Sequence, residues 1–220
     1  MNYSIKTKTE VFTEKLFYTL FDGNATLDDS IDELELLFKE ISSIACKKST
    51  DLCDSIWDKY LAQLPSVLEK LNQDAVYILE NDPASNSIEE VYLAYPGFYA
   101  IAIYRLSHEL YLLDLLLFSR LMSEYAHRIT GTDIHAGATI ASPFFVDHAT
   151  GIVIGETTVI EKNVKIYQGV TLGALSITKE MKNSKRHPTV EEDVCIYANA
   201  TILGGTTIIG KGSIIGGNSW

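Results

Sequence analysis

A repeat with a period of six residues begins after Gly131 and constrains the fold of this chain more than any other feature. A period of six matches neither the 3.6-residue period of an α-helix nor the alternation of a simple β-strand, so it indicates an internal structural repeat. Only Thr158 interrupts the series of aliphatic residues. The aliphatic positions are Ile134, Ile140, Val146, Ile152, Val164, Val170, Val190, Ile196, Ile202, Ile208 and Ile214.

One inward aliphatic residue per hexad, with alanines and glycines between, suits a three-sided coil of parallel β-strands in which each side is one hexad. Three hexads make a coil of about 18 residues, and stacked coils bury the aliphatic side chains in a column that no single repeat could bury alone. A β-sandwich with accidental spacing is the alternative. The spacing therefore predicts a parallel β-helix over residues 131–220.

The chain before the repeat has helical spacing. The apolar residues from Ile31 to Ile41 follow an i, i+3, i+4 pattern, with Asp28, Asp29 and Ser30 as candidate caps. Prolines at 65, 83 and 96 are expected to separate the helices. Further helices are predicted over residues 51–62, 66–79, 88–94, 97–111 and 115–127. The chain is thus predicted to be α+β, with a helical domain over 1–130 and a β-helix domain over 131–220.

One segment breaks the repeat. Val170 and Val190 are 20 residues apart, which leaves an insertion of 14 residues after one hexad, over residues 176–189. It is the most basic stretch of the chain, with Lys179, Lys182, Lys185 and Arg186. Long insertions in repeat proteins map to loops that are often functional. We therefore expect an extruded loop here, and a solvated flap without function is the alternative.

Charge and composition exclude some classes of protein. The net charge of −11 comes mostly from residues before Gly131, and no long basic stripe is present, so nucleic acid is not expected as the main partner. No apolar run has the length of a signal peptide or a membrane span, which predicts a cytoplasmic protein. Cys46, Cys53 and Cys195 are too few and too scattered for a disulfide framework. Cys195 as an acyl-enzyme nucleophile is a minor alternative.

Three short strings narrow the interpretation. They are Asp133-Ile134-His135, the DHATG string of 147–151 leading into Gly155-Glu156-Thr157, and Arg186-His187-Pro188. Together with the hexads they resemble serine O-acetyltransferases among the bacterial hexapeptide-repeat acyltransferases. The segments 82–84 and 104–108 also resemble the last helices of that family, so the resemblance covers roughly residue 82 to the end.

That resemblance implies a fold and a reaction. The fold is a left-handed parallel β-helix, a handedness that general rules for β-crossovers do not predict. The reaction is transfer of acetyl from acetyl-coenzyme A to the hydroxyl of L-serine, which gives O-acetylserine and coenzyme A in the first step of cysteine biosynthesis from serine. No metal is expected.

Transfer to a serine hydroxyl needs a base near pH 7 and a group that orients that base, because the hydroxyl is a poor nucleophile. We predict His148 as the base and Asp133 as its orienting carboxylate, since they are 15 residues apart on adjacent coils. Glu156 and His135 are weaker candidates for a supporting role. A corner hydrogen bond for His148 and a turn cap for Asp133 are the structural alternatives.

The substrate carries a carboxylate and an ammonium that need partners when desolvated. Arg186 with His187 is the candidate clamp for the carboxylate, since a planar guanidinium suits it. The resemblance implies Asp82 and Asp147 for the ammonium and hydroxyl end, although Asp82 before Pro83 can also be only a turn former. The same clamps should accept L-cysteine, which we therefore expect to inhibit.

The resemblance also implies a donor groove along the coils, with pantetheine beside the backbone of Gly173, Ala174 and Ala198, where small residues allow close approach. The Ala174-Leu175 pair departs from the usual family pattern of glycine and threonine. The family's further β-structure and tail, which dock into cysteine synthase, do not follow Trp220. Docking to cysteine synthase is therefore not expected for the sequence as it stands.

The phase of the repeat predicts a shared active site. Counting from Ile134, His148 falls on the third side of the coil, whereas the inserted loop leaves between the first and second sides. Arg186 and His187 are therefore expected to complete the site of a neighbouring chain in a homotrimer, which can pair into a dimer of trimers; a loop folding over its own chain is the alternative.

Three rival functions remain at this point. One is acetylation of a sugar or an antibiotic by the same fold. Another is a zinc lyase with His135, His148 and His187 as ligands. The third is a non-catalytic scaffold for cysteine synthase. The intact strings at 147–151 and 186–188 favour serine acetylation over all three.

Overall fold

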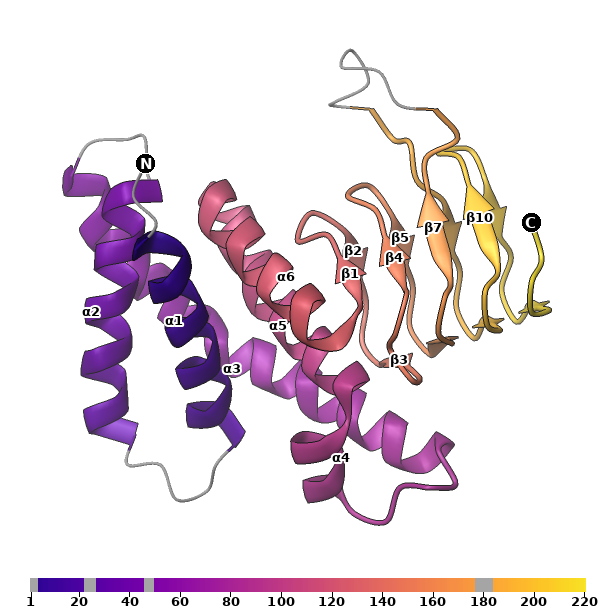
Figure 1. Ribbon diagram of the computed structural model, residues 1–220, viewed down its shortest axis with the longest axis horizontal. Coiled ribbons are helices and arrows are strands. Elements are labelled where there is room, and N and C mark those ends of the chain that lie inside the picture. The colour runs from indigo at the N-terminus through magenta and orange to yellow at the C-terminus, as the bar shows by residue number, and fades with distance from the viewer. Residues whose placement is uncertain (1–3, 22–26, 46–49, 177–183) are drawn as a thin grey trace.

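The computed structural model describes residues 4–21, 27–45, 50–176 and 184–220, and shows helices followed by a stack of β-coils (Figure 1). This confirms the predicted order of a helical part and a part built of parallel strands. The helices within the described residues are α1 Ser4–Phe21, α2 Leu27–Ala45, α3 Thr50–Asn81, α4 Ile88–Ala94, α5 Pro96–Leu112 and α6 Leu116–Thr130. None of these helices combines the length and the apolar character that a membrane span requires.

Helix α3 corrects one expectation, because it continues through Pro65, where a break was predicted. A proline inside a helix costs about 3 kcal/mol. Residues on both sides of it are fully buried, among them Tyr60 and Leu71, and burial of one such side chain contributes about 1.5–3 kcal/mol. Packing on both sides therefore outweighs the local preference for a break.

Two other helix boundaries differ from expectation. Helix α2 begins at Leu27, so Asp28, Asp29 and Ser30 lie inside the helix and not before it. Helix α1 was not delimited from the sequence at all. It buries Phe12, Leu16 and Phe17 in the core beside the later helices. The position of α1 is decided by contacts with residues that are distant in the sequence.

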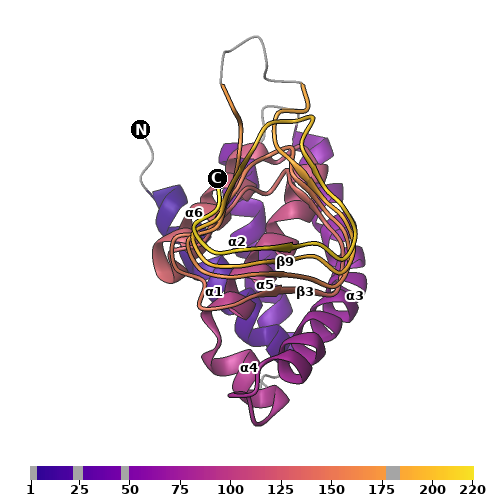
Figure 2. The ribbon, with the colours of Figure 1, turned by 90° about the vertical axis from the view of Figure 1, so that its right-hand side faces the viewer.

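The strands form three parallel sheets, and consecutive strands belong to different sheets, so the chain winds as a three-sided coil (Figure 2). The first sheet contains β1 Asp133–Ile134, β4 Val153–Ile154, β7 Thr171–Gly173 and β10 Thr201–Leu203. The second contains β2 Thr139–Ile140, β5 Val159–Ile160, β8 Thr189–Val190 and β11 Ile208–Ile209. The third contains β3 Phe144–Val146, β6 Val164–Ile166, β9 Cys195–Ile196 and β12 Ile214–Ile215. The left-handed sense of the coil stays a prediction.

Strand pairing corrects the phase of the repeat. Ile134 pairs with Ile154 and not with Ile152, so the first coil is two residues longer than three hexads. The shift falls in the 147–151 segment, after Val146. Thr158 therefore does not interrupt the aliphatic column: it is buried at the small inward position two residues before Ile160. Each hexad has two inward positions, and a spacing of six does not distinguish them.

The last two aliphatic positions of the predicted series point outward. Ile208 is 62% exposed and Ile214 is 71% exposed. Their neighbours Ile209 and Ile215 instead pair with Val190 and Ile196 in the inward columns.

The inserted segment leaves β7 of the first sheet and returns at β8 of the second, as the phase predicted. Leu172 and Val190 hold successive inward positions. The spacing between them exceeds one hexad by 12 residues, so the insertion has 12 residues and not the predicted 14. Residues 177–183 of the predicted extruded loop lie outside the described residues. The loop over 176–189 therefore stays a prediction.

A buried ion pair ties the helices to the first coil. Arg105 on α5 donates to both oxygens of Asp74 on α3, at 2.5 and 2.8 Å, and also to the carbonyl oxygens of Ile140 and Ala141 at 3.0 Å. Asp74 also accepts from the backbone N–H of Phe144 at 2.9 Å. One hydrophobic cluster runs through both parts of the chain. The division into domains 1–130 and 131–220 stays a prediction.

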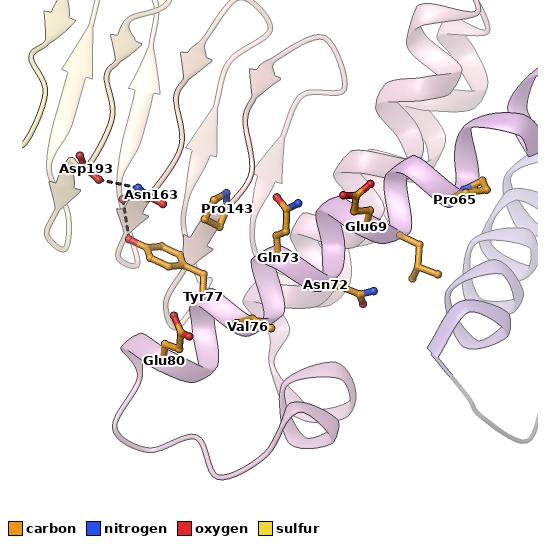
Figure 3. A pocket seen from close by; sticks show the side chains of 11 residues that line it. Pro65, Glu69, Asn72, Gln73, Val76, Tyr77, Glu80, Pro143, Asn163 and Asp193 are labelled. Atoms are coloured by element: carbon orange, nitrogen blue, oxygen red, sulfur yellow. Dashed lines mark hydrogen bonds between the residues drawn. The ribbon is translucent and has the colours of Figure 1, made fainter.

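The C-terminal end of α3 lies beside the corner between the second and third sheets (Figure 3). The Tyr77 hydroxyl donates to the carbonyl oxygen of Asn163 at 2.8 Å, and the Asn163 side chain donates to Asp193 in the next coil at 2.9 Å. A groove follows this contact along α3. The residues that line it include none of the predicted catalytic or binding residues.

Candidate active site

Most of the predicted site residues on the β-helix divide between two corners, at opposite ends of the first sheet. We call the corner between the third and first sheets the His148 corner; it carries Asp147, His148 and Ala198. We call the corner between the first and second sheets the His187 corner; it carries His135, Glu156, Ala174, Arg186 and His187. Asp133 begins β1 and Gly173 ends β7, so these two lie within the first sheet.

The His148 turn has an unusual backbone. His148 and Ala149 both have left-handed φ angles, of 58° and 64°. At the other described corners of the β-helix this conformation is adopted by asparagine, aspartate or glycine, which tolerate it. For other residues it costs roughly 1–3 kcal/mol, and such strain concentrates at functional sites. The turn projects the His148 side chain outward, where it is 68% exposed.

The carboxylate nearest to the His148 ring is that of Asp147, with 3.8 Å between Nε2 and Oδ2. Within the described residues, Asp133 is not paired with His148. Its carboxylate instead clusters with the side chains of Glu124 and His127 on α6, and the carboxylate oxygens and the ring nitrogen lie within 4.8 Å of one another. Asp133 is still close to the turn, because the hydroxyl of Thr132 donates to the carbonyl oxygen of Ala149 at 2.6 Å. The pairing of Asp133 with His148 stays a prediction.

Asp82 follows α3 and lies near the third sheet, because the side chain of the neighbouring Asn81 accepts from Lys165 of β6 at 2.6 Å. Tyr167 follows β6 as Asp147 follows β3, so it lies one coil further along the His148 corner. The pKa of Tyr167 is raised by burial first, and then by the negative charges of neighbouring groups that include Asp147 and Asp82. That Asp82 and Asp147 act together on the ammonium and hydroxyl end of a substrate stays a prediction.

His187 is held in one orientation by its neighbours. Its Nδ1 accepts from the backbone N–H of Thr157 at 3.0 Å, and the hydroxyl of Thr157 accepts from the backbone N–H of His187 at 3.1 Å. Burial, followed by the charge of Arg186, lowers the pKa of His187 to about 4. The ring is therefore neutral near pH 7, with its proton on Nε2. His187 can donate a hydrogen bond to a carboxylate, but it does not contribute the positive charge of a clamp.

Arg186 is paired with Glu156, whose other oxygen accepts from the Tyr111 hydroxyl at 3.1 Å. Burial alone would raise the pKa of Glu156, but hydrogen bonds from Arg186 and Tyr111 and the charges of His135 and Arg186 lower it. Glu156 is therefore a carboxylate that holds the guanidinium. His135 accepts from the backbone N–H of Gly137 at 3.0 Å, and burial lowers its pKa.

Sequence reasoning missed three residues with clear roles in this geometry. The Thr157 hydroxyl accepts from the backbone N–H groups of Arg186 and His187, and the Thr157 N–H donates to the His187 ring. Thr157 belongs to the Gly155-Glu156-Thr157 string. Tyr111 on α5 contacts Glu156, and Tyr95 contacts Asp82. No local pattern marks these two tyrosines, because their partners are distant in sequence.

The residues predicted to contact the donor are also divided. Gly173 packs against Leu203, since a β-carbon added there would lie 2.8 Å from its Cδ2 atom. Ala198 lies at the other end of the first sheet, where its carbonyl oxygen accepts from Asn218 at 2.9 Å. Within one chain, Gly173 and Ala174 do not share a corner with Ala198.

The three histidines of the rival zinc site do not converge. His135 and His187 lie at one corner and His148 at the other. The Nδ1 atoms of His135 and His187 both accept backbone hydrogen bonds. Within one chain, the described geometry does not assemble a three-histidine metal centre.

A three-sided parallel β-helix of stacked hexads, with histidines and carboxylates at its corners, defines the class of hexapeptide-repeat β-helix proteins. No protein-family model matches the chain. It is 43% identical over 149 residues to the serine acetyltransferase of Bacillus licheniformis, a match covering 68% of this chain and 67% of that protein. The chain belongs to the serine acetyltransferase family.

Other relatives agree with this assignment. The plasmid serine acetyltransferase of Synechococcus elongatus is 49% identical over 162 residues, covering 71% of this chain. The match spans 50% of that relative's length. The crystal structure of Entamoeba histolytica serine acetyltransferase 1 in complex with L-cysteine superposes with a TM-score of 0.85 at 32% identity, covering 99% of this chain and 93% of that one.

Proposed function

We propose that this chain transfers acetyl from acetyl-coenzyme A to the hydroxyl of L-serine and releases O-acetylserine and coenzyme A, as the first step of cysteine biosynthesis. The observation that carries the proposal is the His148 turn, in which a strained backbone holds an exposed imidazole beside Asp147. Asp82 is tied to the same end of β3, because Tyr95 donates to Asp82 and Gly97 packs on Val146. Family membership supports the same reaction.

In the proposed reaction, His148 accepts the proton of the serine hydroxyl as its oxygen attacks the thioester carbonyl carbon. The carbon–sulfur bond then breaks, and coenzyme A leaves as a thiolate, which the protonated His148 can neutralise. Asp133 orients the imidazole. The chemistry needs no metal.

The substrate's two charged ends are assigned to the two corners. Asp82 and Asp147 take the ammonium and hydroxyl end. Arg186 and the Nε2–H of His187 take the carboxylate, with Glu156 holding the guanidinium and His135 supporting the same corner. Because the two sets lie at opposite ends of the first sheet, the proposal requires two chains for one complete site.

We therefore propose a homotrimer of left-handed coils in which the His187 corner of one chain meets the His148 corner of the next. A threefold arrangement that joins these corners turns the first sheet towards the axis. The outer face of that sheet carries Val153, Thr171 and Thr201, which are small or apolar, and Val153 is 37% exposed in the single chain. Pairing of two trimers through the helices is the next level of assembly.

The shared interface also provides the proposed donor groove, because Gly173 and Ala174 of one chain then approach Ala198 of its neighbour. L-Cysteine carries the same ammonium and carboxylate as L-serine, so the same groups should bind it and make it an inhibitor. A relative of this chain was solved in complex with L-cysteine.

The test is release of coenzyme A thiol from acetyl-coenzyme A with L-serine, homoserine, a galactoside or no acceptor. We expect release with L-serine well above every other condition. Release with a galactoside but not with L-serine would favour the sugar acetyltransferase. Absence of release under all four conditions by a folded protein would favour the scaffold.

A further inference from the structure

The carboxylate of Asp82 is held on both of its oxygens. Oδ1 accepts from the backbone N–H of Ala84 at 2.8 Å, which closes a short turn after α3. Oδ2 accepts from the hydroxyl of Tyr95 at 2.7 Å. A carboxylate oxygen can accept two hydrogen bonds, so each Asp82 oxygen has capacity for one more, from a ligand. Asp82 is therefore orientated before any substrate arrives.

Tyr95 is itself fixed at a junction of the fold. It lies between α4 and α5 with an extended backbone, and Pro96 begins the next helix. Two residues later, Gly97 packs directly on β3, because a β-carbon there would lie 2.0 Å from the carbonyl oxygen of Val146. Val146 immediately precedes Asp147. The junction thus contacts Asp82 with one residue and the end of β3 with another.

We infer that Tyr95 is a positioning residue, whose hydroxyl orients Asp82 relative to Asp147 so that the two carboxylates receive the ammonium and hydroxyl end of the acceptor. The inference rests on the proposed function and extends it to a residue outside the predicted site. Tyr95 does not contact the reacting atoms; it acts through Asp82.

The chemistry of the phenol supports this role. Burial, followed by the hydrogen bond to Asp82, raises the pKa of Tyr95 to about 12. The hydroxyl therefore keeps its proton, and goes on donating to Asp82, throughout the pH range in which an acetyltransferase would be assayed.

The test compares Tyr95→Phe with the wild-type enzyme in steady-state kinetics. A hydrogen bond to a charged group contributes enough for its loss to raise KM for L-serine by roughly 10-fold. We expect kcat and the KM for acetyl-coenzyme A to stay within about twofold of wild type. Tyr92→Phe is the matched control, because the Tyr92 hydroxyl donates to Asn72 at 3.0 Å on an exposed surface. An unchanged KM for L-serine in Tyr95→Phe overturns the inference.

A double-mutant cycle separates positioning from general stability. If Tyr95 acts through Asp82, then Tyr95→Phe should have no further effect on KM for L-serine in the Asp82→Asn background. Independent, multiplying effects of the two substitutions would overturn the inference. Thermal unfolding of all variants verifies that each one is folded.

Binding of L-cysteine, measured by calorimetry, separates this inference from the proposed function. A wild-type protein without serine-dependent turnover refutes the proposed reaction alone. Binding of L-cysteine that weakens roughly 10-fold in Tyr95→Phe still supports the positioning role. Equal binding by both proteins, or binding by neither, overturns it.

Discussion

The imidazole of His187 occupies the space that a side chain at Gly155 would need: a β-carbon added there would lie 2.0 Å from the ring's Cδ2 atom. Gly155 comes from the end of β4, and His187 returns to the same corner from the inserted segment. The glycine is therefore explained by a close approach between two segments that are 32 positions apart in the printed sequence.

Gly155→Ala should push the His187 ring out of place and weaken the proposed carboxylate contact. We expect KM for L-serine to rise roughly 10-fold, the size of one lost hydrogen bond to a charged group. Steady-state kinetics provide the measurement. Gly210→Ala is the control, because its nearest neighbouring atom would lie 3.8 Å from the new β-carbon. Equal KM values for the two variants would contradict the assigned role of His187.

His148→Ala and Asp133→Asn should both fold and lose serine-dependent release of coenzyme A. We expect a decrease in kcat of roughly 10²-fold or more for the histidine, as for a lost general base, and a smaller decrease for Asp133. The thiol-release assay provides the measurement, and thermal unfolding verifies the fold. Turnover at the wild-type rate by folded His148→Ala would remove the base from the mechanism.

Mixtures of His148→Ala and His187→Ala chains should regain part of the activity that each variant has lost. A shared site explains this result, because some interfaces would combine an intact His148 corner with an intact His187 corner. Activity is measured after the chains have exchanged, with exchange shown by mass-labelled subunits. No recovery despite demonstrated exchange would favour a site within a single chain.

L-Cysteine should compete with L-serine, because both present the same ammonium and carboxylate to the proposed clamps. Initial rates at several concentrations of each amino acid should show a KM for L-serine that rises with L-cysteine at constant kcat. D-Cysteine serves as the control for stereochemical fit. If millimolar L-cysteine leaves serine turnover unchanged, the shared binding site is wrong.

Asp74→Asn should destabilise the protein by about 3–5 kcal/mol, because it leaves the buried Arg105 without its counterion. Both side chains are almost completely buried, at 0% and 4% exposure. Urea unfolding provides the free energy. Asp58→Asn on the exposed side of the same helix is the control, with an expected change within about 0.5 kcal/mol. Equal free energies of unfolding for the two variants would contradict the role of the ion pair in joining helices to coils.

Part of the candidate site could be read from short strings, because the 147–151 string places Asp147 and His148 at one corner and the 186–188 string places Arg186 and His187 at the other. Within the 147–151 string, Asp147 is the carboxylate beside the His148 ring, whereas the predicted partner Asp133 lies with Glu124 and His127, and its pairing with His148 stays a prediction. The contacts of Tyr95 and Tyr111 could not be predicted in this way. Their partners Asp82 and Glu156 come from other elements, and only the packing of α5 on the first coils brings them together.

The sequence by itself determined that the second part of the chain is a β-helix, because a six-residue period of aliphatic residues suits stacked three-sided coils that bury most of them in shared columns. Only the tertiary structure decided the phase of that repeat. Each hexad buries two positions, so the two extra residues of the first coil, between Val146 and Ile154, do not disturb the printed spacing. They do decide which residues form the corner, and they place His148 in the turn at one end of the first sheet while His187 lies at the other end.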